Sequence, residues 1–309
     1  GYEINPLWIR YSPGVVPAIY WIIQMLTEIE DSVALMSPVY YPFANAIRDT
    51  SRTLVDVPLV KDENGYYTMD LESFEATVQK KDVKLFILCS PHNPVGRVWR
   101  EEELRNLLDV CRRNGVYVIA DEIHHDLIMP GQRQVTAAAT GDYDSILITL
   151  TSASKTFNLA SCQNAMAIIP NDALRAKYDA MTRKIKTQSG SSFGYVAYEA
   201  AFRGGKEWLE QLIQLVYGNY QILVKGLKQK LPEAVVSPLE GTYLAWVDLS
   251  AYLSDRDTER TIRDLCNLAV DFGEWFGRNK YENFIRINLA TSPDNVRQVV
   301  ARLDRINTL

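Results

Sequence analysis

Five short apolar runs, separated by amphipathic stretches, most constrain how this chain can fold. They are SVALMSP (32–38), KLFILCS (84–90), VYVIAD (116–121), SILITLTS (145–152) and AMAIIP (165–170). Runs of this length without polar alternation are typical of strands buried on both faces of a sheet. Between them, residues 100–115 carry apolar side chains at helical spacing, and Gly115 favours a helix end. Strands that alternate with helices predict an α/β fold with a mainly parallel central sheet.

The pattern changes near residue 205. A long helical pattern over 206–231 is followed by the apolar stretches GTYLAWVDLS (241–250) and FIRINLA (284–290). We therefore expect a large domain over residues 1–204 and a smaller C-terminal α+β domain over residues 205–309.

Charge and cysteine content exclude several classes of function. The net charge of -5 offers no basic face for nucleic acid. The four cysteines lack CxxC spacing and there are three histidines, so we expect no metal site. The scattered cysteines favour a reducing, cytoplasmic setting. No apolar run reaches the roughly 18 residues of a membrane span, so we expect no membrane partner.

Three polar side chains follow three of the predicted strands. Asn93 lies in PHNPVG after 84–90, Asp121 ends 116–121, and Lys155 follows 145–152. In an open α/β sheet, ligands bind beyond the carboxyl ends of the strands, so these residues are expected at one rim. A lysine amine, an isolated carboxylate and an amide suit pyridoxal 5'-phosphate, an aldehyde cofactor with a pyridine ring. The carboxylate would hold the ring nitrogen protonated.

The phosphate of such a cofactor needs hydrogen-bond donors. Hydroxyl groups of Ser152 and Ser154 are candidates. A helix that begins at SPGVVPAI offers the backbone N–H groups of Val15 and Val16, and Gly14 would permit the tight turn before them.

Each of these residues also has a purely structural interpretation. Taken alone, Lys155 is a solvated loop lysine, Asp121 a helix cap and Asn93 a turn residue. Ser152 and Ser154 are also suited to capping the helix that follows them. The combination of motifs, rather than any one of them, favours the chemical interpretation.

Six motifs in order carry a family resemblance: SPGVVPAI, SPVYYPF, SPHNPVGRVW, ADEIHHDL, SASKTFNLA and FIRINLA. With them the chain resembles the pyridoxal-phosphate-dependent aminotransferase class I/II superfamily of fold type I. The resemblance is greatest to the cystathionine beta-lyase branch that includes MalY and PatB, and it implies the PLP-dependent transferase fold and a homodimer.

The resemblance also implies roles for individual residues. Lys155 would bond to the cofactor aldehyde and later move the Cα proton, Asp121 would pair with the pyridine nitrogen, and Asn93 would contact the ring oxygen. Tyr40 would stack on the ring in preference to Tyr41. A second group of residues completes the set, with His124 as a further ring-oxygen contact and Arg286 and Tyr243 at the substrate.

Residue periodicity independently supports Arg286. In FIRINLA, a period of two places Ile285 and Ile287 on one face, and Phe284 and Arg286 on the face away from the core. An arginine fork suits a carboxylate.

Two departures from the family pattern are apparent. Gln163 occupies the position, eight residues after the lysine, where many aminotransferases have a phosphate-binding arginine. Relatives also carry several tens of residues before the segment with which this chain opens at Gly1, so we expect the family's N-terminal segment to be missing.

The predicted function is that of a carbon–sulfur beta-lyase acting on a sulfur amino acid such as cystathionine, with thiol, pyruvate and ammonia as products. An aminotransferase would use the same residues, because transamination differs only in where the proton is returned. A regulatory protein that retains the fold is the third possibility.

Overall fold

The computed structural model describes residues 2–308, and its larger sheet has seven strands. Across the sheet their order is β1 (Ile9–Ser12), β9 (Ala165–Ile168), β8 (Leu147–Thr151), β7 (Tyr117–Asp121), β6 (Val83–Cys89), β2 (Ser32–Leu35) and β3 (Thr53–Asp56). From β8 to β3 neighbouring strands are parallel, whereas β9 is antiparallel to both β8 and β1. The predicted α/β class is confirmed, and all five predicted strands are present.

Helices cover both faces of this sheet. One face packs against α1 (Val15–Leu26), α2 (Tyr41–Asp49) and α6 (Asp172–Lys184), and the other against α3 (Leu71–Lys81) and α4 (Glu101–Arg113). Along β6, Leu85 and Ile87 are buried in the first core, and Phe86 and Leu88 in the second. This alternation explains the uninterrupted apolar run, because a strand covered on both faces has no solvated side.

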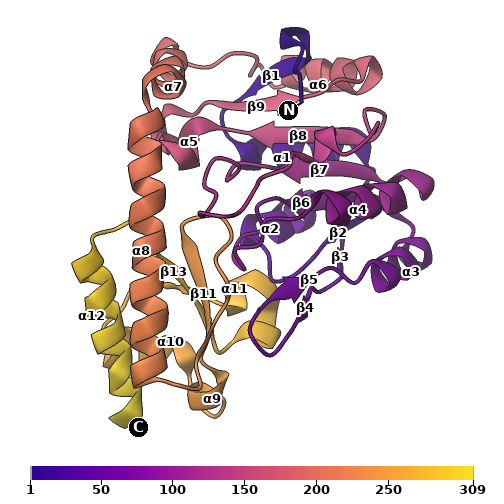
Figure 1. Ribbon diagram of the computed structural model, residues 1–309. Helices are drawn as coiled ribbons and strands as arrows, with labels where there is room; N and C mark the ends of the chain where they lie inside the picture. The colour runs from indigo at the N-terminus through magenta and orange to yellow at the C-terminus, as the bar shows by residue number, and fades with distance from the viewer. Residues whose placement is uncertain (1, 309) are drawn as a thin grey trace.

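The C-terminal part builds a second, four-stranded antiparallel sheet. Its order is β10 (Val235–Val236), β11 (Leu244–Asp248), β13 (Phe284–Asn288) and β12 (Asp271–Phe272). The long helix α8 (Lys206–Lys230) and α12 (Pro293–Leu303) cover one face of it. In Figure 1, α8 runs from α7 (Ser192–Gly204), beside the large sheet, down to the small sheet, with α12 alongside.

Shorter elements complete the chain. The strands β4 (Val60–Lys61) and β5 (Tyr67–Thr68) form a hairpin. The short helices are α5 (Ala153–Thr156), α9 (Ser250–Leu253), α10 (Thr258–Arg260) and α11 (Glu274–Gly277). The 3₁₀ segments are η1 (Pro6–Trp8), η2 (Ala137–Ala139), η3 (Ala160–Cys162), η5 (Arg278–Tyr281) and η6 (Asp304–Thr308), and η4 (Thr261–Leu265) is a π-helical turn. Within residues 2–308, no helix has both the length and the hydropathy needed to cross a membrane.

The periodicity predicted for β13 is present, but the face assigned away from the core is largely covered. Ile285 and Ile287 are buried in the small sheet's own core. On the other face, Phe284 is 6% exposed and stacks on Trp246 at a ring distance of 5.2 Å. This face is covered because it is turned toward the large sheet rather than toward solvent, and it places Arg286 between the two sheets.

Candidate active site

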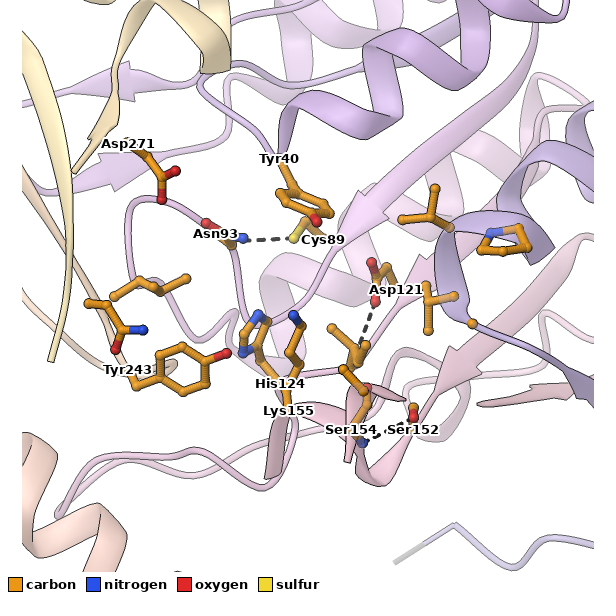
Figure 2. Close-up of a pocket in the computed structure, with 18 of the residues that line it drawn as sticks. Tyr40, Cys89, Asn93, Asp121, His124, Ser152, Ser154, Lys155, Tyr243 and Asp271 are labelled. Atoms are coloured by element: carbon orange, nitrogen blue, oxygen red, sulfur yellow. Dashed lines mark hydrogen bonds between the residues drawn. The ribbon is translucent and has the colours of Figure 1, made fainter. Parts of the chain in front are cut away.

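A cavity of about 400 Å³ lies at the carboxyl ends of β6, β7 and β8, where the small sheet meets the large one. All twelve residues named from the sequence line it: Gly14, Val15, Val16, Tyr40, Asn93, Asp121, His124, Ser152, Ser154, Lys155, Tyr243 and Arg286. Figure 2 shows Asn93, Asp121, His124 and Lys155 around the cavity, with Tyr40 and Tyr243 at its sides. The structure therefore brings the predicted residues together, and their individual roles stay predictions.

Asp121 is an almost fully buried carboxylate at the end of β7. It is 4% exposed, and its Oδ1 accepts a hydrogen bond from the backbone N–H of Ile123 at 3.1 Å. Burial raises its pKa to about 7, although the Ile123 N–H and the charge of Lys155 act in the opposite direction. A desolvated carboxylate in this state gains most from a cationic partner, such as a protonated ring nitrogen.

Lys155 projects into the cavity from α5, directly after β8. Burial lowers the pKa of its amine, the charge of Arg286 lowers it further, and Asp121 partly opposes both effects. Within residues 2–308, the amine makes no hydrogen bond or ion pair. An uncommitted amine with a depressed pKa is the form that a nucleophile or a proton carrier requires.

Asn93 and Arg286 are hydrogen-bonded to each other across the junction between the sheets. Arg286 Nη1 donates to Asn93 Oδ1 at 2.8 Å. A guanidinium can only donate, so the amide oxygen must face it. No group within residues 2–308 bonds to the amide nitrogen of Asn93, so it can donate into the cavity, as the predicted contact with a ring oxygen requires.

Arg286 has a second partner that the sequence did not reveal. Its Nε donates to Oδ2 of Asp271 at 3.0 Å, and its Nη2 also donates to Oδ2. The guanidinium lies 4.7 Å from the centre of the Phe276 ring, and its side chain is only 11% exposed. Asp271 lies opposite Arg286 in the register between β12 and β13, and it lines the cavity.

The two adjacent tyrosines have different surroundings. Tyr40 precedes α2 and lines the cavity, and burial raises the pKa of its hydroxyl. Tyr41 does not line the cavity. The centre of its ring lies 5.9 Å from that of Trp275 and 6.0 Å from that of Phe276. Of the two, only Tyr40 is placed to stack on a ring held between Asp121 and Lys155.

His124 is a neutral histidine with an unused nitrogen. It is 4% exposed, and burial lowers its pKa to about 3, with further lowering from Lys155 and Arg286. Its ring meets the Tyr243 ring edge to face at 5.6 Å. In residues 2–308, no group bonds to its buried Nδ1. A buried polar atom without a partner at the wall of a cavity indicates a bound group that supplies one.

At the part of the cavity expected to bind the phosphate, the backbone conformation of Gly14 differs from the predicted turn. Gly14 has φ -179°, so it is extended and does not form a turn that only glycine could adopt. A Cβ there would lie 3.3 Å from Pro17, which makes the position crowded. Among the described residues no side chain caps α1, so the N–H groups of Val15 and Val16 remain available for an anion.

The two serines have separate roles. Ser152 caps α5, because its Oγ accepts from the Ser154 N–H at 3.1 Å and donates to the Asn164 carbonyl at 2.7 Å. The capping alternative therefore describes Ser152, whereas the Ser154 hydroxyl has no partner within residues 2–308 and is free for a phosphate. Gln163 is exposed outside the cavity, where its carbonyl accepts from the Tyr11 hydroxyl.

The donor set fits pyridoxal 5'-phosphate. The cavity offers the N-terminus of α1 to an anion. It also contains the buried carboxylate of Asp121, the amine of Lys155 and the unpartnered Nδ1 of His124. Sequence reasoning missed several further lining residues: Pro13, Pro17, Cys89, Ile123, Ala160, Asn164, Leu244, Asp271 and Asn288. Most of them have apolar side chains, which carry no chemical signal of a site, and the place of Asp271 depends on strand pairing.

Comparison with known proteins gives consistent results. The model of the aminotransferase class I and II family matches residues 5–303. Cystathionine beta-lyase PatB of Bacillus subtilis is 36% identical, over 98% of this chain and 79% of PatB. Protein MalY of Escherichia coli is 31% identical, over 97% of this chain and 76% of MalY. The structure of cystalysin from Treponema denticola, which contains a pyridoxal 5'-phosphate cofactor, superposes with a TM-score of 0.95 at 32% identity, over 99% of this chain and 78% of cystalysin.

Proposed function

The chain belongs to the aminotransferase class I and II family of pyridoxal-phosphate-dependent enzymes, and we propose that it is a carbon–sulfur lyase. It would cleave a sulfur amino acid of the cystathionine type by α,β-elimination to thiol, pyruvate and ammonia. The convergence of Asn93, Asp121 and Lys155 from three strand ends on one cavity carries this proposal. The similarity to PatB supports lyase chemistry over other reactions of the family.

Some residues of the cavity would bind the cofactor and others the substrate. When bound, the cofactor supplies an aldehyde for the amino group and a pyridine ring that withdraws electrons from Cα. Asp121 holds the proton at the ring nitrogen, and Asn93 donates its amide to the ring oxygen. The phosphate is bound by the Ser154 hydroxyl and by the N–H groups of Val15 and Val16.

Lys155 is the proposed proton carrier. Burial and the charge of Arg286 lower its pKa, which favours the neutral amine that can accept the Cα proton. Arg286 fixes the substrate by its carboxylate, which sets the Cα–H bond near the Lys155 amine. His124 is the further contact to the ring oxygen, and Tyr243, whose ring packs against that of His124, lies on the substrate side.

The test uses the cofactor-loaded protein with L-cystathionine, and it measures pyruvate and free thiol. Lysine labelling by borohydride in the wild type is compared with a Lys155→Ala variant and with Lys184→Ala, which removes an exposed lysine of α6. We expect labelling and pyruvate in the wild type and in K184A, and neither in K155A. A wild type without pyruvate would contradict the lyase proposal.

The second candidate is an aminotransferase, because the family model that matches the chain includes this activity. It is tested by supplying an amino acid and a 2-oxo acid acceptor and measuring the new amino acid. Amino-group transfer that exceeds pyruvate release would favour this candidate over the lyase.

We also infer a homodimer, which the family resemblance implies, and a cytoplasmic setting, which the scattered cysteines favour. Exposed apolar side chains on α7 and α8 support a partner there, with Phe193 87% and Val196 66% exposed. Four free cysteines support a reducing compartment. Light scattering should give twice the chain mass, and a monomeric mass would contradict the inference. Cell fractionation tests the compartment.

We propose the division into domains 1–204 and 205–309 as predicted. Gly205 separates α7 from α8, and α8 is buried in the small sheet's core further along its length. Limited proteolysis of the holoprotein should cleave first near residues 204–206, and first cleavage within α8 would contradict this boundary.

A further inference from the structure

The guanidinium of Arg286 is partly committed before any substrate arrives. Of the five N–H donors of an arginine, the Nε hydrogen and one on Nη2 bond to Asp271, and one on Nη1 bonds to Asn93. One hydrogen remains on each of the two terminal nitrogens. Two parallel N–H groups of this kind make the bidentate contact that a carboxylate accepts.

The Asp271 contact fixes which edge of the guanidinium is left open. A single oxygen, Oδ2, accepts from both Nε and Nη2. Asp271 therefore occupies the edge of the guanidinium that carries these two nitrogens. Pairing of β12 with β13 places the two residues directly opposite each other. Both residues line the cavity, and the two open donors are those that remain for a substrate carboxylate.

Asp271 has two opposite effects on a substrate carboxylate. Its negative charge repels the carboxylate, but its side chain is 35% exposed, so water screens the repulsion. Its orienting effect acts on a guanidinium that is only 11% exposed, beside the like charge of Lys155. A buried cation without its counterion is costly, so the loss of Asp271 should disturb the placement of Arg286 more than it relieves the repulsion.

We propose that Asp271 is the positioning residue for carboxylate recognition, holding Arg286 by its side so that only the terminal nitrogens face the substrate. This rests on the proposed function, in which Arg286 binds the α-carboxylate. Asp271 itself does not touch the substrate. Its removal is expected to weaken the recognition of carboxylate-bearing ligands while it leaves the reaction of the amine unchanged.

Two small probes isolate the carboxylate. Aminooxyacetate and O-methylhydroxylamine share an aminooxy group that reacts with aldehydes, and only the first carries a carboxylate. The second-order rate constant of each is read from the visible absorbance of the holoprotein, without any carbon–sulfur cleavage. Asp271→Ala should lower the rate constant of aminooxyacetate by about tenfold and change that of O-methylhydroxylamine by less than about twofold.

Two further variants separate orientation from charge and from general damage. Asp271→Asn keeps an acceptor for Nε without the charge, and its aminooxyacetate rate should stay within about threefold of the wild type. Asp248→Ala removes another carboxylate–cation pair of the same sheet, with Lys61, outside the cavity, and should change neither probe. With substrate, D271A should raise KM about tenfold with little change in kcat.

Three outcomes with D271A would overturn the proposal. An unchanged aminooxyacetate rate in D271A would show that Asp271 does not position Arg286, and a faster one would show that repulsion dominates. Equal slowing of both probes would show general damage to the site. A wild type that reacts with both probes but releases no pyruvate would refute the lyase function alone.

Discussion

Replacing Asp121 with asparagine should stabilise the cofactor-free protein and at the same time disable the enzyme. The pKa of Asp121 rises from 3.8 to about 7 on folding because of burial. Between these values the unfolded chain has an ionised carboxylate and the folded chain a protonated one, so the folded state binds more protons. Folding stability from this group is full below about pH 4 and is lost as the pH rises through 7.

The magnitude follows from the same two values. A rise from 3.8 to about 7 is about three pH units, or about 4 kcal/mol at 1.36 kcal/mol per unit. In asparagine this pH-dependent cost is absent, while Oδ1 can still accept from the Ile123 N–H. The stability advantage of D121N should therefore grow by about 1.4 kcal/mol per pH unit from pH 4 to about 7 and then level off.

With the cofactor bound, the substitution should be harmful instead of stabilising. Asparagine supplies no charge to the ring nitrogen, and a unit charge pair at about 4 Å is worth roughly 4 kcal/mol at an effective dielectric constant of 20. Loss of this interaction corresponds to about a thousandfold lower kcat. One substitution should thus strengthen the empty fold and weaken the working enzyme.

The assay is urea unfolding of cofactor-free wild type and D121N between about pH 5 and 8.5, followed by pyruvate release from the holoproteins. A buried amide that lacks partners would lower the stability of D121N equally at every pH, so the slope of the difference is the decisive quantity. If the difference in unfolding free energy between wild type and D121N did not change with pH, it would refute the conclusion that burial of the ionisable Asp121 destabilises the cofactor-free protein. Activity near the wild-type level would refute its pairing with the ring.

Three further tests address other parts of the molecule. Arg286→Lys keeps the charge but removes the fork, so steady-state kinetics should show a KM raised about tenfold or more with a smaller change in kcat. Arg97→Ala should cost about 3–5 kcal/mol in urea unfolding, because Arg97 is 1% exposed between Glu103 and Glu240; the exposed Arg297→Ala should cost under about 1 kcal/mol. Ser152→Ala should lower stability by about 1 kcal/mol through the lost cap of α5, whereas Ser154→Ala should weaken cofactor binding in an absorbance titration without that loss. Equal effects of the two serine variants would contradict their separate roles.

The large sheet and its site were predictable because both leave strong local signals. Strands covered on both faces appear as apolar runs, and the polar residue that ends each run falls at one rim by the geometry of parallel strands. Asn93, Asp121 and Lys155 needed no knowledge of long-range pairing. The direction of β9 was not available in this way, since an apolar run has the same appearance in parallel and antiparallel pairing.

Features that depend on pairing between distant segments were missed. Asp271 lies in a strand of two residues, too short for any periodic pattern, and only its register with β13 places it beside Arg286. The burial of Phe284 likewise depends on Trp246 of the neighbouring strand. Gly14 was assigned a turn that its extended backbone does not make, because a glycine in a motif does not specify its φ angle.

The site has a cofactor end within the large sheet and a substrate end where the two sheets meet. Asp121, Lys155 and Ser154 all belong to the large sheet and its following loops, so the cofactor end is fixed by one set of local contacts. The substrate end joins Arg286 of the small sheet to Asn93 of the large one, and it therefore depends on how the two sheets meet. Changes at that junction should alter KM more than cofactor affinity, because Asn93 is the one group at the junction that is also proposed to bind the ring, and Asp121, Lys155 and Ser154 lie away from it.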